Sequence, residues 1–306
     1  MRSERLLIRT GFVLLSFIWG STWLAIKIGL DSVPPFYGVA LRFLVAIPIL
    51  FVLIKLRDLS IPRDRKSWNL FLTVGLLSFG FPFSILYWAE QFLPSGLMSI
   101  LFAIFPFVVA LLSHFFLDEK INTFKIVGIV LGFGGIILVF SRGLHWDDNT
   151  AFWAMGSVLF CTVLQGGGLI LVKKNGKDIS PVTLNFAGML VGTFWVGALA
   201  LLLERFSDIH LDAKGIGSIL YLGTLGSVVT FVVYFWLLKR VEAVYLSLVA
   251  FITPITASFL GAIVLDEMLE PNTFLGAALV LVGILVANGK GLLNLIGWRS
   301  KQTIVS

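Results

Sequence analysis

One block of sequence occurs twice in this chain, and the two copies lie 148 residues apart. The segment from Phe105-Pro106 to Leu117-Asp118-Glu119 returns as Thr253-Pro254 to Leu265-Asp266-Glu267. Without gaps, 15 of the 62 residues from 75 to 136 are identical to the residues 148 positions later. Because the matches include Trp, Pro, Gly, Asp and Glu, shared hydrophobicity alone does not explain them. The repeat predicts two homologous halves, residues 1–145 and 146–306, within one membrane domain.

The composition fits a protein that meets lipid over most of its surface. Hydrophobic residues make up 58% of the sequence and charged residues 13%, whereas soluble globular proteins carry about 25% charged residues. The net charge of +6 comes from Lys and Arg in short loops between apolar runs. A nucleic-acid binder needs a basic stripe on a solvated face, so no nucleic-acid partner is expected. The partners expected are the lipid bilayer and a small-molecule substrate.

The apolar runs predict ten transmembrane helices and no strands. Crossing the hydrocarbon core takes about 20 mostly apolar residues, and membrane helices tolerate internal Gly and Pro. The first run follows three Arg residues as a signal peptide does, but it is longer and contains Lys27, so we expect a retained helix. The predicted segments are 10–30, 35–56, 69–92, 95–117, 123–141, 151–172, 181–204, 214–239, 242–265 and 271–290.

The distribution of Lys and Arg predicts the orientation of these helices. With ten helices, eighteen Lys and Arg fall on one side of the membrane and three on the other, while Lys27 and Arg42 fall within helices. The positive-inside rule then places both termini in the cytoplasm. Five helices per half is an odd number, so the second half is inserted upside down relative to the first. This inverted-repeat plan puts the substrate near the midplane where the halves meet.

The residues also resemble a known family, the bacterial EamA-like transporters of the drug/metabolite transporter superfamily. The resemblance covers nearly the whole chain and rests on Trp19-Gly-Ser-Thr-Trp-Leu-Ala-Ile-Lys-Ile-Gly, Pro34-Pro35, Ala40-Leu41-Arg42-Phe43 and the two P…LDE blocks. Proteins similar to this one export amino acids and other small metabolites. The resemblance therefore implies a multi-pass protein of the bacterial inner membrane and this broad class of substrates.

Repeat, composition and resemblance together favour a secondary carrier with alternating access. We expect export of small polar or amphipathic metabolites, with amino acids as the first candidates; an uptake or exchange carrier for another metabolite or drug is the alternative. A passive channel does not require an inverted duplication. An intramembrane enzyme would need a catalytic cluster, yet His114, His145 and His210 lie on different segments and no metal-spaced motif occurs. We therefore expect no enzymatic activity, no catalytic residue, no metal and no cofactor, in a monomer or weak homodimer.

Arg42 is the charged residue predicted deepest in the membrane. It lies seven residues after Pro35, about 10 Å inside the boundary at 1.5 Å per residue. A charge at this depth should face the bundle interior and have a partner. One interpretation is capture of a substrate carboxylate by the planar guanidinium. The other is a fixed ion pair with Glu90 or Asp31, and the sequence leaves both open.

Glu90 is the acidic residue nearest the expected pathway. A partly desolvated carboxylate takes up a proton more readily than a solvated one, so Glu90 is a candidate for proton coupling. The alternatives are that it neutralises Arg42 or is solvated. No Asp or Glu lies in the middle of a predicted helix, which favours facilitated diffusion, exchange or weak proton coupling.

Polar and aromatic residues at mid-depth form the predicted substrate site. Small-molecule pockets are mostly apolar with a few hydrogen-bonding groups, although packing or lipid contact by itself also explains each aromatic residue. Gln165 stands beside three glycines, which permit close approach of a backbone. The candidates are Trp19, Thr22, Trp23, Arg42, Tyr87, Trp88, Gln91, Gln165, Tyr234 and Trp236.

Pro106 and Pro254 fall at equivalent positions near the centres of two predicted helices. A proline in a helix removes one backbone hydrogen bond and bends the helix. The repeat of this feature predicts two gating hinges, with static kinks as the alternative.

Overall fold

The computed structural model describes residues 2–142, 149–238, 240 and 243–289, and within these ranges the chain forms helices and loops without a β-strand. The first half contains α1 (Arg2–Leu30), α2 (Pro35–Leu56), α3 (Arg65–Val74), η1 (Gly75–Gly80), α4 (Phe81–Glu90), α5 (Ser95–Phe102), α6 (Phe105–Leu117) and α7 (Thr123–Arg142). The second half contains α8 (Asn149–Asn175), α9 (Pro181–Leu203), η2 (Phe206–Asp208), α10 (Ala213–Gly223), η3 (Thr224–Val229), α11 (Thr230–Leu238), α12 (Ala243–Val264) and α13 (Pro271–Ala287).

Eight helical stretches in this described part are long and apolar enough to cross a membrane. Two shorter apolar helices, Val249–Val264 and Pro271–Ala287, occupy the places of the last two predicted segments. The protein is therefore a multi-pass, all-helical membrane protein, as the sequence predicts. The eight stretches are Leu6–Leu30, Pro35–Leu56, Arg65–Glu90, Ser95–Leu117, Thr123–Ser141, Asn149–Asn175, Pro181–Leu203 and Ala213–Tyr234.

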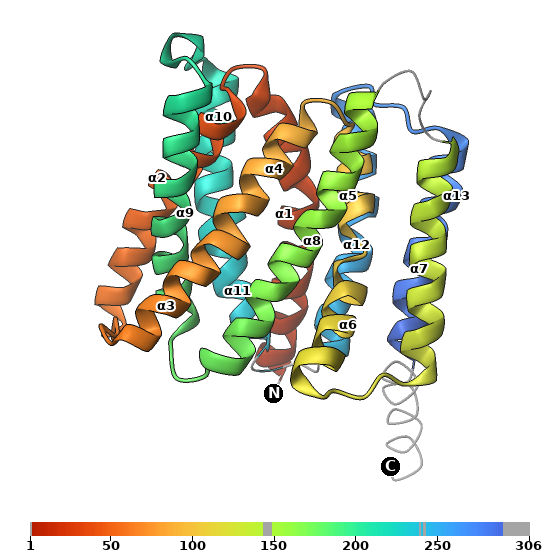
Figure 1. Ribbon diagram of the computed structural model, residues 1–306, viewed down its shortest axis with the longest axis horizontal. Helices are drawn as coiled ribbons and strands as arrows, with labels where there is room; N and C mark the ends of the chain where they lie inside the picture. The colour runs from red at the N-terminus through yellow and green to blue at the C-terminus, as the bar shows by residue number, and fades with distance from the viewer. Residues whose placement is uncertain (1, 143–148, 239, 241–242, 290–306) are drawn as a thin grey trace.

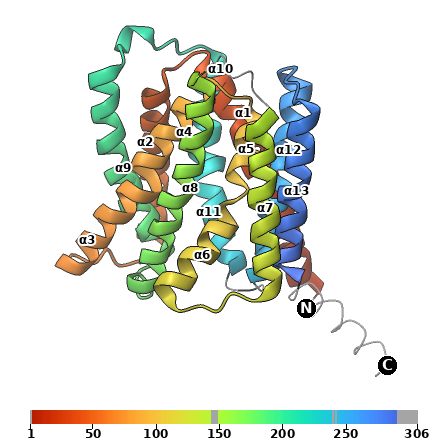
Figure 2. The same cartoon turned by 45° about the vertical axis from the view of Figure 1, so that its right-hand side comes forward.

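Helix boundaries recur at the spacing of the sequence repeat. The continuous rod 65–90 has its counterpart at 213–238, α5 begins at Ser95 and α12 at Ala243, and α7 begins at Thr123 and α13 at Pro271. Corresponding helices run in opposite directions: α1 rises from the lower end of Figure 1, whereas α8 descends from the upper end. The same holds for α7 and α13, which lie side by side at one edge of the bundle in both views (Figures 1 and 2).

Local signals explain where several helices begin. Asp64 and Asp212 are the N-caps of α3 and α10, and each carboxylate accepts a hydrogen bond from the backbone three residues later. Prolines at the first position begin α2, α9 and α13, where the missing N–H costs nothing. Asp64 and Asp212 lie 148 residues apart, so these two caps fix the same end of two repeat-related helices.

Two π-helical segments interrupt the rods at repeat-related places. They are η1, Gly75–Gly80, between α3 and α4, and η3, Thr224–Val229, between α10 and α11. A π-turn shifts the register of side chains and is frequent at functional sites. Both lie near the middle of their rods, so the middle of the bundle is a candidate place for a functional site.

The two central prolines differ from the prediction of equivalent bends. The helix ends at Phe102 and restarts at Phe105, with Pro106 in the first turn of α6. By contrast, α12 runs through Pro254 without interruption. Pro106 thus begins a helix, where its lack of an N–H is harmless, and only Pro254 lies inside one.

Candidate functional site

Arg42 is a buried residue that joins the two halves. Its side chain is 4% exposed. Its Nε donates to Ser227 Oγ at 2.9 Å and one terminal nitrogen donates to the carbonyl oxygen of Gly226 at 3.2 Å, both in η3. On the other side its second terminal nitrogen lies 3.4 Å from the Tyr87 hydroxyl, and the guanidinium stands over the Phe83 ring at 4.9 Å. The π-turn therefore presents its hydroxyl and carbonyl groups to the arginine.

The guanidinium has no carboxylate partner. Within the described ranges, the only ion pair between side chains joins Lys173 to Glu119 at 2.9 Å. The structure thus contradicts the predicted alternative of a fixed ion pair between Arg42 and Glu90 or Asp31. Because an uncompensated buried charge is costly, the neutral groups around Arg42 hold it in place without satisfying its charge.

Glu90 is the second buried and unpaired charge. The residue is 0% exposed, and neither carboxylate oxygen has a hydrogen-bond partner. It lies three residues after Tyr87 on α4, so both unpaired charges border the same stretch of this helix. A carboxylate this deeply buried without donors needs a cation or a proton.

Lys27 has a structural role at the end of α4. Its Nζ donates to the carbonyl oxygens of Glu90 at 2.6 Å and Leu93 at 2.9 Å. A cation at a helix C-terminus satisfies carbonyls that have no partner within the helix. Lys27 therefore caps α4 and joins it to α1.

The remaining predicted site residues separate into groups. Thr22 lies against Gly226 beside Arg42, because a Cβ added at this glycine would come within 3.0 Å of the Thr22 methyl group. Trp19 and Tyr234 are in ring contact at 5.4 Å, and Trp23 packs on Phe102 at 5.7 Å.

Two further predicted residues, Gln91 and Gln165, are not among the residues that hydrogen-bond to Arg42 in the described part of the chain. Gln91 is exposed at the end of α4 and donates to the carbonyl of Trp88. Gln165 is half-buried on α8, where Gly166 lies against Leu112 and Gly168 against Ser78 of η1. Two of the three glycines beside Gln165 thus meet side chains of α6 and η1.

A cavity of about 610 Å³ opens at the lower end of the bundle. The first turns of α1 and α9, the last turns of α2 and most of α11 surround it, and these segments lie toward that end (Figure 1). Its walls are mostly apolar, and Trp236 is the one predicted site residue in them. The polar residues that line it, which sequence reasoning missed, are Thr10, Arg57, Ser180, Asn185 and Arg240.

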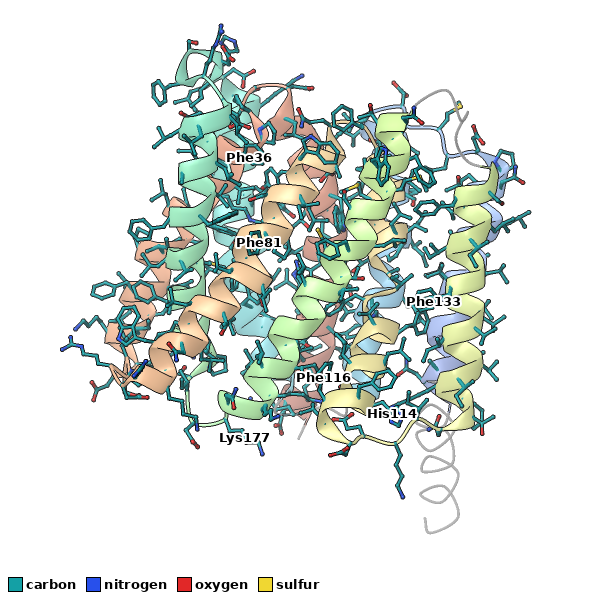
Figure 3. All side chains as sticks on the ribbon, viewed as in Figure 1. Phe36, Phe81, His114, Phe116, Phe133 and Lys177 are labelled. Atoms are coloured by element: carbon teal, nitrogen blue, oxygen red, sulfur yellow. The ribbon has the colours of Figure 1, made fainter. Side chains whose placement is uncertain are left out.

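The upper end, marked by Phe36 in Figure 3, is held by hydrogen bonds between the halves. Ser32 Oγ donates to Asp212 at 2.7 Å, and Glu204 accepts from the N–H groups of Phe36 at 2.8 Å and Tyr37 at 2.9 Å. The N–H of Gly215 and the Ser32 hydroxyl hold the pKa of Asp212 below its ordinary value. Burial raises the pKa of Glu204, and the two N–H groups offset part of that shift.

No metal centre is apparent at either end. Among the described residues, no group of three or more His, Cys, Asp or Glu side chains is placed to hold a metal ion.

Comparisons with known proteins agree with this architecture. The transporter YoaV of Bacillus subtilis, itself described as uncharacterized, is 30% identical over 276 residues, covering 90% of this chain and 94% of its own. The protein PagO of Salmonella typhimurium is 28% identical, covering 89% and 90%. A probable amino-acid metabolite efflux pump of Escherichia coli is 25% identical, covering 95% and 96%.

The fold and the family model agree as well. A solved crystal structure matches with a TM-score of 0.67 at 17% identity, covering 94% of this chain and 96% of that one, which supports the fold. The model of the EamA-like transporter family matches twice, at residues 8–141 and at residues 151–289. Since these matches span most of the sequence, the chain belongs to the EamA-like transporter family.

Proposed function

We propose that this protein is a secondary carrier that exports small polar or amphipathic metabolites by alternating access, with amino acids as the first candidates. Ten helices cross the membrane as two inverted repeats, residues 1–145 and 146–306, with both termini in the cytoplasm. The lower end of Figure 1 is then the cytoplasmic end and the upper end is the outer end. The recurring helix boundaries, the opposite directions of α1 and α8 and the double family match support this arrangement.

The observation that carries the substrate class is the pair of unlike, unpaired charges at Arg42 and Glu90. Arg42 has only neutral partners and Glu90 has none. A zwitterion supplies both missing counter-charges, its carboxylate to the guanidinium and its ammonium group to the carboxylate. The Escherichia coli relative named as a probable amino-acid metabolite efflux pump supports the same class.

The remaining predicted residues belong to the proposed path. Substrate enters from the cytoplasmic cavity past Trp236 and passes Trp19 and Tyr234 to reach Thr22, Arg42 and Tyr87. Trp88 and Gln91 stand at the outer mouth, and Trp23 and Gln165 border the path on α1 and α8. The break before Pro106 and the position of Pro254 within α12 are the proposed joints of the gates. When no substrate is bound, Glu90 takes up a proton instead.

Counterflow in liposomes tests this function. The purified protein is reconstituted into vesicles loaded with an unlabelled amino acid, and entry of labelled amino acid is followed. A carrier gives transient, saturable accumulation and releases the substrate chemically unchanged. Flux that rises linearly with concentration without counterflow indicates a channel, and a converted substrate indicates an enzyme; either result contradicts the proposal.

Two variants sharpen the experiment. Glu90→Gln keeps the shape of the side chain but removes the charge, so it should raise the apparent KM for zwitterionic amino acids and abolish any dependence on a pH gradient. Glu270→Gln changes an exposed carboxylate and should leave both unchanged. If the two variants have the same KM and the same dependence on a pH gradient, Glu90 is not part of the substrate site.

A further inference from the structure

The two Asp-Glu pairs form the same turn at the ends of α6 and α12. Asp118 and Asp266 both adopt left-handed backbone angles, with φ of 55° and 53°. The N–H of Glu119 donates to the Ser113 carbonyl at 3.3 Å, and that of Glu267 donates to the Gly261 carbonyl at 3.2 Å. Such a turn closes the helix and fixes the direction of the following residue. Each half therefore presents one glutamate in the same way.

The two glutamates have different partners. Glu267 accepts from the N–H of Ser95 at 3.0 Å, from its hydroxyl at 2.7 Å and from the N–H of Gly96 at 3.4 Å. These groups begin α5 in the other half, and a helix N-terminus favours an anion. Glu119 instead pairs with Lys173 at 2.9 Å, and both side chains are about half exposed. His114, which bonds the Glu119 carbonyl, marks this turn at the lower end of Figure 3.

The repeat identifies the partner that Glu119 lacks. Ser95, the first residue of α5, corresponds to Ala243, the first residue of α12. By the symmetry of the halves, Glu119 should meet the N-terminus of α12 as Glu267 meets that of α5. The contact between the glutamate and the helix N-terminus is therefore formed by Glu267 at the outer end and is not formed by Glu119 at the cytoplasmic end.

Exposure of repeat-related residues shows the same asymmetry. Leu7 of α1 is 59% exposed and its counterpart Met155 of α8 is 0% exposed. Leu14 is 42% exposed and its counterpart Thr162 is 0% exposed. Leu7 and Leu14 line the cavity at the cytoplasmic end. The structure is therefore closed at the outer end and open at the cytoplasmic end.

We propose that Glu267 and Glu119 are two latches of which only one is closed at a time. Resting on the proposed function, the outer latch joins Glu267 to the start of α5 in the state that faces the cytoplasm. When the halves rock to the other state, Glu267 releases Ser95, and Glu119 leaves Lys173 to bind the backbone N–H groups at Ala243 and Val244. Lys173 holds Glu119 while the cytoplasmic latch is open.

The sequence also sets which latch is stronger. Ser95 supplies a hydroxyl hydrogen bond to Glu267, whereas alanine at 243 has no hydroxyl to give to Glu119. The outer latch thus has one more hydrogen bond, and this bond involves a charged acceptor. It follows that the carrier without substrate faces the cytoplasm.

Cysteine labelling at two repeat-related sites measures the balance. In a Cys161→Ala background, Thr10→Cys reports the cytoplasmic cavity and Val158→Cys, at the corresponding position of α8, reports the outer side. Thr10 lines the cavity, and Val158 is 0% exposed. A membrane-impermeant maleimide is applied to inside-out vesicles for the first reporter and to right-side-out vesicles for the second.

Single changes at the latches should move both reporters together. Ala243→Ser adds the missing hydroxyl, so labelling should slow at Thr10→Cys and speed up at Val158→Cys by about tenfold, as expected for one such hydrogen bond. Ser95→Ala should act in the same direction by weakening the outer latch. Ser99→Ala is the matched control, because Ser99 bonds only to the carbonyl of Gly96 in its own helix, and it should move neither reporter.

A double variant isolates Glu119. Glu119→Gln removes the charge that the new hydroxyl would bind, so it should cancel the effect of Ala243→Ser. The latches are refuted if Ala243→Ser moves neither reporter, or if its effect persists with Glu119→Gln. Labelling needs no substrate, so the two proposals can fail separately. If the variants shift labelling of the two reporters but no counterflow is seen, the latches are supported and the carrier function is contradicted. If counterflow is seen but the variants do not shift labelling, the carrier function is supported and the latches are contradicted.

Discussion

Gly135 of α7 lies directly against the carbonyl oxygen of Gly276 in α13: a Cβ added at Gly135 would stand 2.5 Å from that oxygen. Their repeat partners Gly128 and Gly283 meet in the same way, since a Cβ at Gly128 would stand 2.5 Å from the Gly283 carbonyl. Each helix thus presents the same two glycines to the other. This reciprocal contact requires α7 and α13 to be related by a two-fold axis that passes between them.

The glycine contact predicts opposite effects for two neighbouring substitutions. Gly135→Ala should lower the free energy of unfolding by about 1–3 kcal/mol, since the overlap forces the helices apart. Gly134→Ala should raise it by about 0.5–1 kcal/mol, because alanine favours the helix and nothing lies within 4 Å of a Cβ at Gly134. Thermal unfolding in detergent measures both, and a destabilised Gly134→Ala would count against this packing.

Arg42→Lys should raise the apparent KM of transport about tenfold without reducing the amount of folded protein, because a point charge replaces a bidentate fork. Ser227→Ala removes the hydroxyl that accepts the hydrogen bond from Arg42 Nε. This change should raise the KM by about threefold or less. Since Arg42 and Glu90 form no ion pair, Glu90→Gln should not rescue Arg42→Lys. If Glu90→Gln restores the Arg42→Lys variant, or if Arg42→Lys leaves the KM unchanged but reduces the amount of folded protein, then Arg42 has a structural role only.

Pro106→Ala and Pro254→Ala should shift the access of the carrier in opposite directions, because the halves are inverted. The effect of Pro106→Ala should be larger, since the chain is already broken at Ala103 and Ile104 and a new N–H at position 106 lets the helix continue. Labelling of Thr10→Cys and Val158→Cys reports the shift. Unchanged labelling in both variants would make the prolines static features.

Asp212→Ala should lower the Tm of the folded protein through loss of the N-cap of α10. The folded-state pKa of Asp212 lies below its ordinary value of 3.8. A depressed carboxyl pKa gives stabilisation that is complete above the ordinary value and is lost as pH falls through the folded pKa. The difference in Tm from the parent should therefore be constant above about pH 5 and shrink below it, whereas Asp208→Ala at an exposed position should leave the Tm close to that of the parent.

The sequence alone located the helices and the repeat because these depend on local hydrophobicity and on residues that recur at one spacing. The change from an apolar to a charged residue at Leu117-Asp118 and at Leu265-Asp266 marks two helix ends directly. The cap residues Asp64 and Asp212 follow from equally local rules. The apolar sequence of these helices does not predict the π-turns η1 and η3, because a π-turn has no hydrophobic period of its own.

The site was only partly accessible to such reasoning. Arg42 was identified by its depth, but its partner Ser227 lies 185 residues away, and no local pattern links the two. The cavity depends on how far α1 stands from α9 and α11, so Thr10 and Asn185 carried no signal as single polar residues. Gln91 followed an apolar run and was placed in the pathway, yet the helix ends before it and leaves it exposed.

Sided labelling of one repeat-related pair tests the inverted arrangement most directly. Lys120 and Met268 correspond at the spacing of 148 and follow the same turn, and both are exposed. With Cys161→Ala in each, Lys120→Cys should react with an impermeant maleimide only in inside-out vesicles, and Met268→Cys only in right-side-out vesicles. If both residues react from the same side of the membrane, the two halves are not inverted and the alternating-access account is wrong.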